Sequence, residues 1–363
     1  MKKSFFINGG AGRVLCALPG LEWYQQNVDK DVVIIAEAWN ELFLVNKNLR
    51  HNVWPLGAKG LWEKIRDTEL ISPEPYRLNA YFNQRCNMIQ AFDMLVNDLT
   101  DVPESKSINL DINKVDQIHG HSMCDKIKMQ TGKEKIVVFQ PFGSGAKQEG
   151  RFIYDSSGRS FELRDVYRII DKLTEHYALV IMSTIQLPPP EKPNSSVVIP
   201  NDTNLLQWMG VINACDYFVG CDSMGQHYAH ALGKPATVVI GSTFPENITY
   251  PGNTDFTVID AGKEKRQYMP FRVTMDWALE RDNEDLMIFE EDVFDEIISS
   301  IIKKLGKPKN KAPQRLPLAN PTQGDSCCPP TGSPQVQQPF TQNFQNYLNT
   351  QNNDSKRSKR RRK

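Results

Sequence analysis

The stretch FVGCDSMGQHYAHALGKP, residues 218–235, decides the fold of this chain. Its apolar start predicts a buried strand that ends at Gly220, and the residues that follow predict a helix that begins near Ser223. Asp222 then lies close to the N-cap, and Ser223 presents its hydroxyl group at the positive end of the helix. His227 follows four residues after Ser223, on the same helix face. These side chains suit an anion-binding site, although a capping aspartate and a buried structural histidine would give the same pattern.

Strand-like and helix-like stretches alternate on both sides of this segment, which is typical of β-α units and a parallel sheet. The expected strands are residues 4–8, 32–36, 52–56, 69–72, 135–140, 178–183, 217–220, 236–240 and 256–259. The expected helices are residues 14–27, 84–99, 163–175, 204–213, 225–232 and 290–305. The polar, helical segment 113–130 leads into a fresh buried strand, so the pattern restarts near residue 132. We therefore expect two Rossmann-like α/β domains, at residues 1–131 and 132–305, that face a cleft.

The composition is that of a globular protein. Of the 363 residues, 40% are hydrophobic and 24% are charged. No apolar run approaches the roughly 20 residues of a transmembrane helix. Residues 1–8 predict a first strand rather than a signal peptide, so we expect a cytoplasmic protein. The seven cysteines lack the C-x-x-C spacing of a metal site, which favours reduced thiols and no bound metal.

Residues 306–363 differ from the rest of the chain because Pro, Gln, Asn, Ser and Thr replace most aliphatic residues. Such a segment buries too little apolar surface to fold, so we expect a disordered tail. It holds eleven Lys or Arg against two Asp, so its net charge is +9 and that of residues 1–305 is −9. The basic run 356–363 predicts attraction to nucleic acid or to an anionic membrane surface. A run that only adds solubility is the alternative.

The first of two glycine-rich turns is NGGAGRV, residues 8–14, between a predicted strand and a predicted helix. Gly10 and Gly12 would let the backbone approach a ligand and leave amide groups free at the helix start. We expect both glycines and Arg13 to line the cleft on the acceptor side. Tight packing of the turn would explain the same glycines.

The second turn, residues 140–146, follows the first strand of the second half. Gly143, Ser144 and Gly145 would supply backbone donors, and Arg159 would supply a bidentate cation. Backbone donors and a guanidinium are what a diphosphate leaving group requires. Arg151 is a second arginine nearby, and a surface loop with solvated arginines is the alternative.

The decisive stretch, together with residues 241–246, resembles the donor-domain signature of the heptosyltransferase-like glycosyltransferases, family nine. That signature reads D-[ST]-G-x-x-H-x-A-x-A-x-G-x-P, followed by G-x-T-x-P. The matching residues are Asp222, Ser223, His227, Ala229, Ala231, Gly233, Pro235, Gly241, Thr243 and Pro245. Residues 12–21 look like the family's G-D-x-x-x-x-L-P-A-L. Residues 143–145 and 158–161 lie where the family has its phosphate-contacting K-R-W region.

The resemblance covers residues 4–305 and implies the two-domain GT-B fold. It also implies inverting sugar transfer without a metal or a cofactor, from a nucleotide-sugar donor held mainly by the second half. The expected donor-binding residues are Gly143, Ser144, Gly145, Arg159, Asp222, Ser223, Gly225 and His227. Two positions depart from the family pattern. Met224 stands where the motif has glycine, with Gly225 one place later, and Arg13 stands at the acidic catalytic position of G-D.

A guanidinium is not a general base near neutral pH, so another group has to accept the proton of the acceptor hydroxyl. Glu37 and Glu74 follow predicted strands of the first half and are the candidate catalytic bases, with His51 and Asp93 as weaker choices. The acceptor would be a saccharide or a modified nucleic-acid base. If no base exists, the alternative is a catalytically inactive sugar- or nucleotide-binding protein that associates with nucleic acid through its basic tail.

Overall fold

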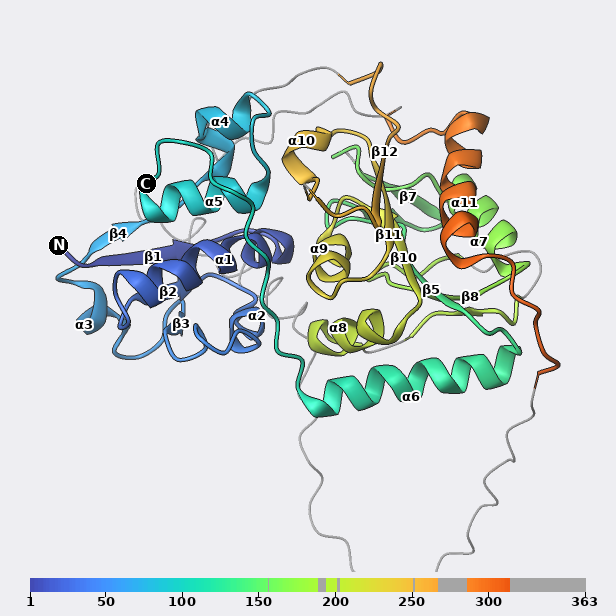
Figure 1. Cartoon of the computed structure of the whole chain (residues 1–363), viewed down its shortest axis with the longest axis horizontal. Coiled ribbons are helices and arrows are strands. Elements are labelled where there is room, and N and C mark those ends of the chain that lie inside the picture. Colours follow the sequence, from blue (N-terminus) through green and yellow to red (C-terminus); the bar gives the residue numbers. More distant parts are fainter. Residues whose placement is uncertain (156, 189–193, 201–202, 251, 267–285, 314–363) are drawn as a thin grey trace, which may run out of the picture. The chain divides into compact units, whose positions relative to one another are not determined.

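The computed structural model describes residues 1–155, 157–188, 194–200, 203–250, 252–266 and 286–313 (Figure 1). Two separate parallel sheets with helices on their faces lie in this part of the chain. The predicted α/β class with Rossmann-like halves is therefore confirmed. Most of the predicted tail, residues 314–363, lies outside the described residues.

The first sheet has the strand order β3-β2-β1-β4. Its strands are β1 (Lys3–Ile7), β2 (Val33–Ala36), β3 (Val53–Pro55) and β4 (Glu69–Ile71). The helices and turns of this half are α1 (Ala11–Asn27), α2 (Asn40–Leu44), α3 (Leu61–Ile65), η1 (Pro75–Arg77), α4 (Asn79–Phe82), α5 (Met88–Asn97) and α6 (Lys114–Thr131). Successive side chains of a strand point to opposite faces of the sheet. Accordingly, Phe5 and Ile7 join the core around α1, whereas Phe6 packs beside Leu61 of α3.

The second sheet has the order β12-β11-β10-β5-β8-β9, and all its strand pairs are parallel. Its strands are β5 (Ile136–Gln140), β8 (Ala178–Ile181), β9 (Val197–Val198), β10 (Tyr217–Cys221), β11 (Ala236–Ile240) and β12 (Phe256–Asp260). Its helices are α7 (Leu163–Thr174), α8 (Leu205–Ala214), α9 (Met224–Ala231), α10 (Pro245–Ile248) and α11 (Glu291–Leu305). Val137 and Phe139 of β5 pack toward α7 and α11, and Ile136 and Val138 pack on the opposite face, with α8. Burial on both faces explains why these strands are continuous apolar runs.

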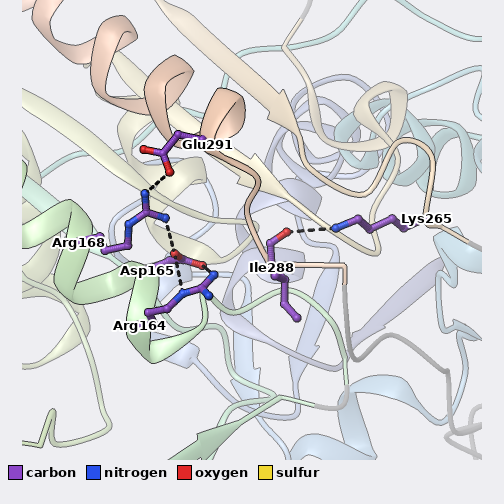
Figure 2. Close-up of polar contacts among 6 residues, drawn as sticks. All are labelled: Arg164, Asp165, Arg168, Lys265, Ile288 and Glu291. Carbon is purple, nitrogen blue, oxygen red and sulfur yellow. Dashed lines mark hydrogen bonds and ion pairs between the residues drawn. The ribbon is translucent and has the colours of Figure 1, made fainter.

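Helix α11 is tied to α7 by a small ionic cluster, drawn in Figure 2. Asp165 is fully buried and accepts hydrogen bonds from Arg164 and Arg168. Arg168 also pairs with Glu291 at 2.5 Å, and its guanidinium lies 4.2 Å from the centroid of the Phe294 ring. The charged groups of this cluster pair with one another, so we assign the cluster a structural role.

The long helix α6 packs against α8 of the second half. The two helices cross at Gly120 and Gly210, where a Cβ atom on Gly120 would lie 2.1 Å from the Gly210 carbonyl oxygen. Although α6 precedes the domain boundary expected at residue 131, its contacts belong to the second sheet. The boundary itself stays a prediction.

All the expected strands and helices are present, with differences at their ends. Helix α1 begins at Ala11 rather than at residue 14, because Gly10 is its N-cap. Helix α5 begins at Met88 rather than at residue 84, because the side chains of Asn87 and Gln90 form a capping box. The elements that the sequence did not predict are all short: α2, α3, α4, α10, η1, β9 and the hairpin of β6 (Lys147–Glu149) and β7 (Phe152–Tyr154). Among the described residues, none of the helices combines the length and the apolar character that a membrane crossing requires.

Candidate functional site

The order of the second sheet places its ligand-binding edge between β5 and β10. From β5 the chain moves outward through β8 and β9, and then returns to the other side of β5 to form β10. Ligands of open α/β sheets bind beyond the carboxyl ends of the strands at such a switch point. The loops that follow β5 and β10 carry residues 140–145 and 222–225. The residues predicted to hold a donor are therefore brought to one edge of the sheet.

Gln140 connects these two loops, a role that the sequence did not predict. Its Nε2 donates to Ser223 Oγ at 3.2 Å, and its Oε1 accepts from the Gly225 amide at 2.9 Å. A Cβ atom on Gly225 would lie 2.3 Å from Gln140 Oε1, so this glycine allows close packing. Gly225 was expected among the donor contacts, but its amide is already occupied.

Asp222 joins the two parts of the sequence motif. Its Oδ2 accepts from Thr243 Oγ1 at 2.6 Å, and its Oδ1 accepts from Gln226 Nε2 at 2.5 Å. Gln226 is fully buried, and no described residue donates a hydrogen bond to its Oε1. Since both carboxylate oxygens of Asp222 are engaged, this residue fixes the loops after β10 and β11 relative to each other.

A second carboxylate organises the loop that carries Arg159. Asp155 Oδ1 accepts from Ser157 Oγ and Asp155 Oδ2 from Ser160 Oγ, each at 2.5 Å. Ser160 Oγ in turn accepts from the Gly143 amide at 3.0 Å, which joins this loop to the one after β5. A Cβ atom on Gly145 would lie 2.5 Å from Asp155 Oδ1, so close packing requires a glycine there.

Arg159 lies at this junction of loops, partly buried. Its Nε donates to Ser157 Oγ at 3.1 Å and its Nη2 to Ser144 Oγ at 3.5 Å, and it forms no ion pair within the described residues. Burial lowers the pKa of Arg159, but nearby Asp222, Tyr76 and Asp155 more than offset this, and the pKa lies above its usual value. Arg159 is thus a cation whose side-chain hydrogen bonds, within the described residues, are to hydroxyl groups.

The first sheet has its own switch point, between β1 and β4, and Arg13 and Glu74 lie there. Arg13 Nη1 pairs with Glu74 Oε1 at 2.9 Å, and both side chains are only 12% exposed. Arg13 Nη2 donates to Asn8 Oδ1 at 3.0 Å, while its buried Nε has no hydrogen-bond partner in the part of the chain that the structure describes. Arg13 belongs to the first turn of α1, where the helix dipole disfavours a cation, and Glu74 offsets that charge. Two residues singled out separately from the sequence are therefore partners.

Glu37 differs from Glu74 in its surroundings. It follows β2, is exposed, and accepts the Gly9 amide at 3.2 Å through Oε2. His51 is exposed and bonds Arg50 at 3.1 Å. Asp93 is fully buried on α5, where it accepts hydrogen bonds from Asn97 and Lys106, so it is less accessible to a substrate than Glu37.

His227 lies against the first half of the chain. Its Nδ1 is 3.5 Å from the Cys16 sulfur and bonds the hydroxyl group of Tyr250. A Cβ atom on Gly12 would lie 2.9 Å from the His227 ring, so Gly12 allows α1 to approach α9. Burial lowers the pKa of His227 to about 4, against the opposing effect of Asp222. The neutral imidazole thus packs between α1 and α9, and Gly10 provides the N-cap of α1.

No protein-family model matches the sequence, and a search of curated proteins returned no match. Solved structures do match. The family 9 glycosyl transferase from Veillonella parvula DSM 2008 gives a TM-score of 0.52 at 12% identity, with 83% of this chain and 97% of that chain covered. The iron-containing dodecameric glycosyltransferase TibC from enterotoxigenic E. coli H10407 gives 0.53 at 10% identity, with 84% and 77% covered.

TibC in complex with ADP-D-β-D-heptose, described as a heptosyltransferase, gives a TM-score of 0.52 at 10% identity, with 83% of this chain and 76% of that chain covered. At such low identity the likeness concerns the fold. It agrees with the resemblance found in the sequence. The chain therefore has the GT-B fold of the heptosyltransferase-like, family-nine glycosyltransferases, in a form that diverges strongly in sequence.

Proposed function

We propose that this protein is an inverting glycosyltransferase that moves a sugar from a nucleotide-sugar donor to a hydroxyl acceptor. The observation that carries the proposal is Arg159, a partly buried guanidinium without an ionic partner among the described residues, beside Ser144 at the β5–β10 switch point. Such a site suits the diphosphate of a donor, because a guanidinium binds phosphate oxygens in a bidentate manner. That the fold neighbour TibC is known in complex with ADP-D-β-D-heptose supports this class of ligand.

In the proposed reaction the acceptor hydroxyl attacks the anomeric carbon while the bond to the diphosphate breaks. Arg159 stabilises the negative charge that develops on the leaving diphosphate. A carboxylate accepts the hydroxyl proton, and Glu37 is the preferred base because its side chain is exposed and, among the described residues, only the Gly9 amide donates to it. Glu74 is the second choice, because Arg13 already occupies its Oε1.

The proposed transfer uses no metal and no cofactor, since Arg159 would supply the positive charge that a metal provides in other enzymes. The acceptor is a saccharide or a modified nucleic-acid base. A contribution of the basic run 356–363 to acceptor or membrane binding stays a proposal, as does a cytoplasmic location.

The Arg13–Glu74 ion pair favours a second candidate function. It places a cation at the position of the family's acidic residue and engages the nearest carboxylate. A protein that binds a nucleotide sugar without transferring the sugar would retain Arg159 and need no base. The two candidates share donor binding and differ in turnover.

Calorimetric titration with ADP, UDP and GDP tests the shared step. We expect one nucleotide to bind, with the same affinity in EDTA, and Arg159→Gln to weaken it about 10- to 100-fold, as expected for a charge-assisted hydrogen bond. Arg151→Gln is the matched control, because Arg151 is exposed on the adjacent hairpin. Failure of the wild-type protein to bind any of the three would contradict both functions. Release of free sugar from the matching nucleotide sugar separates the transferase from the binding protein.

A further inference from the structure

Trp39 lies in the loop after β2, at the edge of the first sheet that also carries the candidate base Glu37. Strands β1 and β2 are parallel neighbours, and Ile7 pairs with Ala36 at their carboxyl ends (Figure 1). The Trp39 indole Nε1 donates to the Gly9 carbonyl at 3.1 Å, and the Gly9 amide donates to Glu37 Oε2 at 3.2 Å. Both polar backbone groups of Gly9 are thus held by side chains of one loop.

The backbone of Trp39 has a conformation that costs free energy. Its φ is 60° and its ψ is 36°, in the left-handed region that a bulky L-residue rarely occupies. Trp39 is the N-cap of α2, yet its side chain makes no capping hydrogen bond, and tryptophan is not among the residues that stabilise this position. Helix α2 therefore explains neither the residue nor its conformation. The hydrogen bond of its indole goes to Gly9 instead.

Gly9 has the conformational freedom that makes such a contact useful. Its φ is 89°, a value that glycine adopts without cost, and glycine rotates more freely than any other residue. A Cβ atom at Gly9 would lie 2.8 Å from Arg13 Cδ, so the position has no room for a side chain that would restrict this rotation. Because the Trp39 indole holds the Gly9 carbonyl, it limits the rotation of Gly9 and keeps the amide directed at Glu37.

We propose that Trp39 is a positioning residue that acts through Gly9 on the Glu37 carboxylate. The inference rests on the proposed transferase function and adds a residue to its mechanism. Glu37 is exposed, and an exposed glutamate side chain has many rotamers unless hydrogen bonds hold it. A general base has to lie within hydrogen-bond reach of the proton that it accepts. With Oε2 bonded to the Gly9 amide, the carboxylate keeps an orientation in which it can accept the proton of the acceptor hydroxyl.

The first test is spectroscopic and needs no turnover. In the full chain with isotope-labelled tryptophan, the NMR signal of the Trp39 indole is the one that Trp39→Phe lacks. We expect Glu37→Gln to move this signal, because loss of the carboxylate charge weakens the bond from Gly9. Glu41→Gln is the matched control, since Glu41 also stands two residues from Trp39 but belongs to α2. An unmoved signal in Glu37→Gln, or an equal shift in both variants, would overturn the proposal.

The second test is kinetic. Trp39→Phe keeps an aromatic ring but lacks the donor, and it should lower kcat for sugar transfer about 5- to 10-fold, as the loss of one hydrogen bond predicts. The KM for the donor should not change, because Arg159 is unaltered. In the Glu37→Ala background the same substitution should have no further effect, since Trp39 acts through Glu37. Trp62→Phe, on α3 of the first half, is the control and should transfer sugar like the wild type.

Two further variants separate positioning from a purely structural role of Trp39. Trp39→Ala and Trp39→Gly both remove the indole, but glycine adopts a φ of 60° without strain, so Trp39→Gly should unfold at the higher urea concentration. If Trp39 positions Glu37, both variants lose the same fraction of kcat. A loss of kcat that follows stability, or an undiminished kcat in Trp39→Phe, would overturn the proposal.

The outcome stays separate from that of the proposed function. A wild type that binds a nucleotide but transfers no sugar would contradict the transferase. The NMR signals of the indole groups would then decide alone whether Trp39 orients Glu37.

Discussion

The two switch points of this molecule use arginine in opposite ways. At the first sheet, Arg13 is neutralised by Glu74 at 2.9 Å. At the second sheet, Arg159 contacts the hydroxyl groups of Ser144 and Ser157 and forms no ion pair with the described carboxylates. Removing one partner of a buried ion pair is strongly destabilising, whereas a guanidinium that is hydrogen-bonded only to hydroxyl groups can still form a charge-assisted pair with an anionic ligand. Under the proposed function, Arg159 of the second half would meet the donor, and the chemistry of the first half would depend on whether Glu37 or Glu74 accepts the proton.

The largest expected effect concerns the catalytic base. Under the transferase proposal, Glu37→Ala should lower turnover about 10²- to 10⁴-fold, because a positioned general base contributes that factor. Glu74→Ala should lower turnover less, since Glu74 is engaged with Arg13. Both variants should keep nucleotide affinity. Initial rates of sugar transfer measure this, and a larger loss for Glu74→Ala would assign the base to the first switch point.

The ion pair itself should dominate stability at the first switch point. Arg13→Ala should lower the free energy of unfolding by about 3 kcal/mol, because it leaves a buried carboxylate without its partner. The double variant Arg13→Ala, Glu74→Ala should lose less than the sum of the single variants. Urea unfolding of the four proteins measures the coupling. If the losses of unfolding free energy were additive, Arg13 and Glu74 would not be energetically coupled. The difference between Arg13, which is paired, and Arg159, which pairs with no described carboxylate, would then have no energetic basis.

The smallest expected effect is the pH dependence of the free energy of unfolding that comes from His227, where α1 and α9 meet. Its folded-state pKa of about 4 is below the ordinary value of 6.5, because burial disfavours the imidazolium. The resulting stability is complete above pH 6.5 and is lost as the pH falls toward 4. We expect a loss of about 2 kcal/mol between pH 7 and pH 5 from this group.

His227→Gln should flatten that pH dependence when urea unfolding is followed at both pH values. Part of the pH dependence should remain in this variant, because burial also lowers the pKa of His230 to about 4. If the free energy of unfolding depended on pH equally in the variant and in the wild type, His227 would not contribute to that dependence.

The sequence predicted the long elements well because their patterns are local. The apolar runs of β5 and β10 and the periodic face of α7 stand out without tertiary knowledge. The short helices α2 and α3 span a single turn each, and β9 has only two residues, so none offers a period to detect. The strands of the β6–β7 hairpin have three residues each, which is too short for an alternating pattern to be recognised.

Of the candidate site, the motif contained both Asp222 and Thr243, but their hydrogen bond at 2.6 Å was found only in the structure. The role of Gln140 was missed because a glutamine at a strand end carries no distinctive signal. Arg13 and Glu74 were both noted, but 61 residues separate them, and no local pattern reveals such a pair. The partners of side chains that pair over such sequence distances can be identified only when the topology of the fold is known.

The Gly120–Gly210 crossing determines how the chain can be divided. Because each glycine lies against the backbone of the other helix, α6 cannot shift along α8 or be replaced by solvent without exposing a closely fitted surface. The far end is fastened as well, since the Lys311 amide donates to the Gly132 carbonyl at 2.8 Å. A fragment intended to carry the second half alone therefore has to begin before Lys114 and extend through Lys311. A cut at residue 132 would remove helix α6, on which α8 packs.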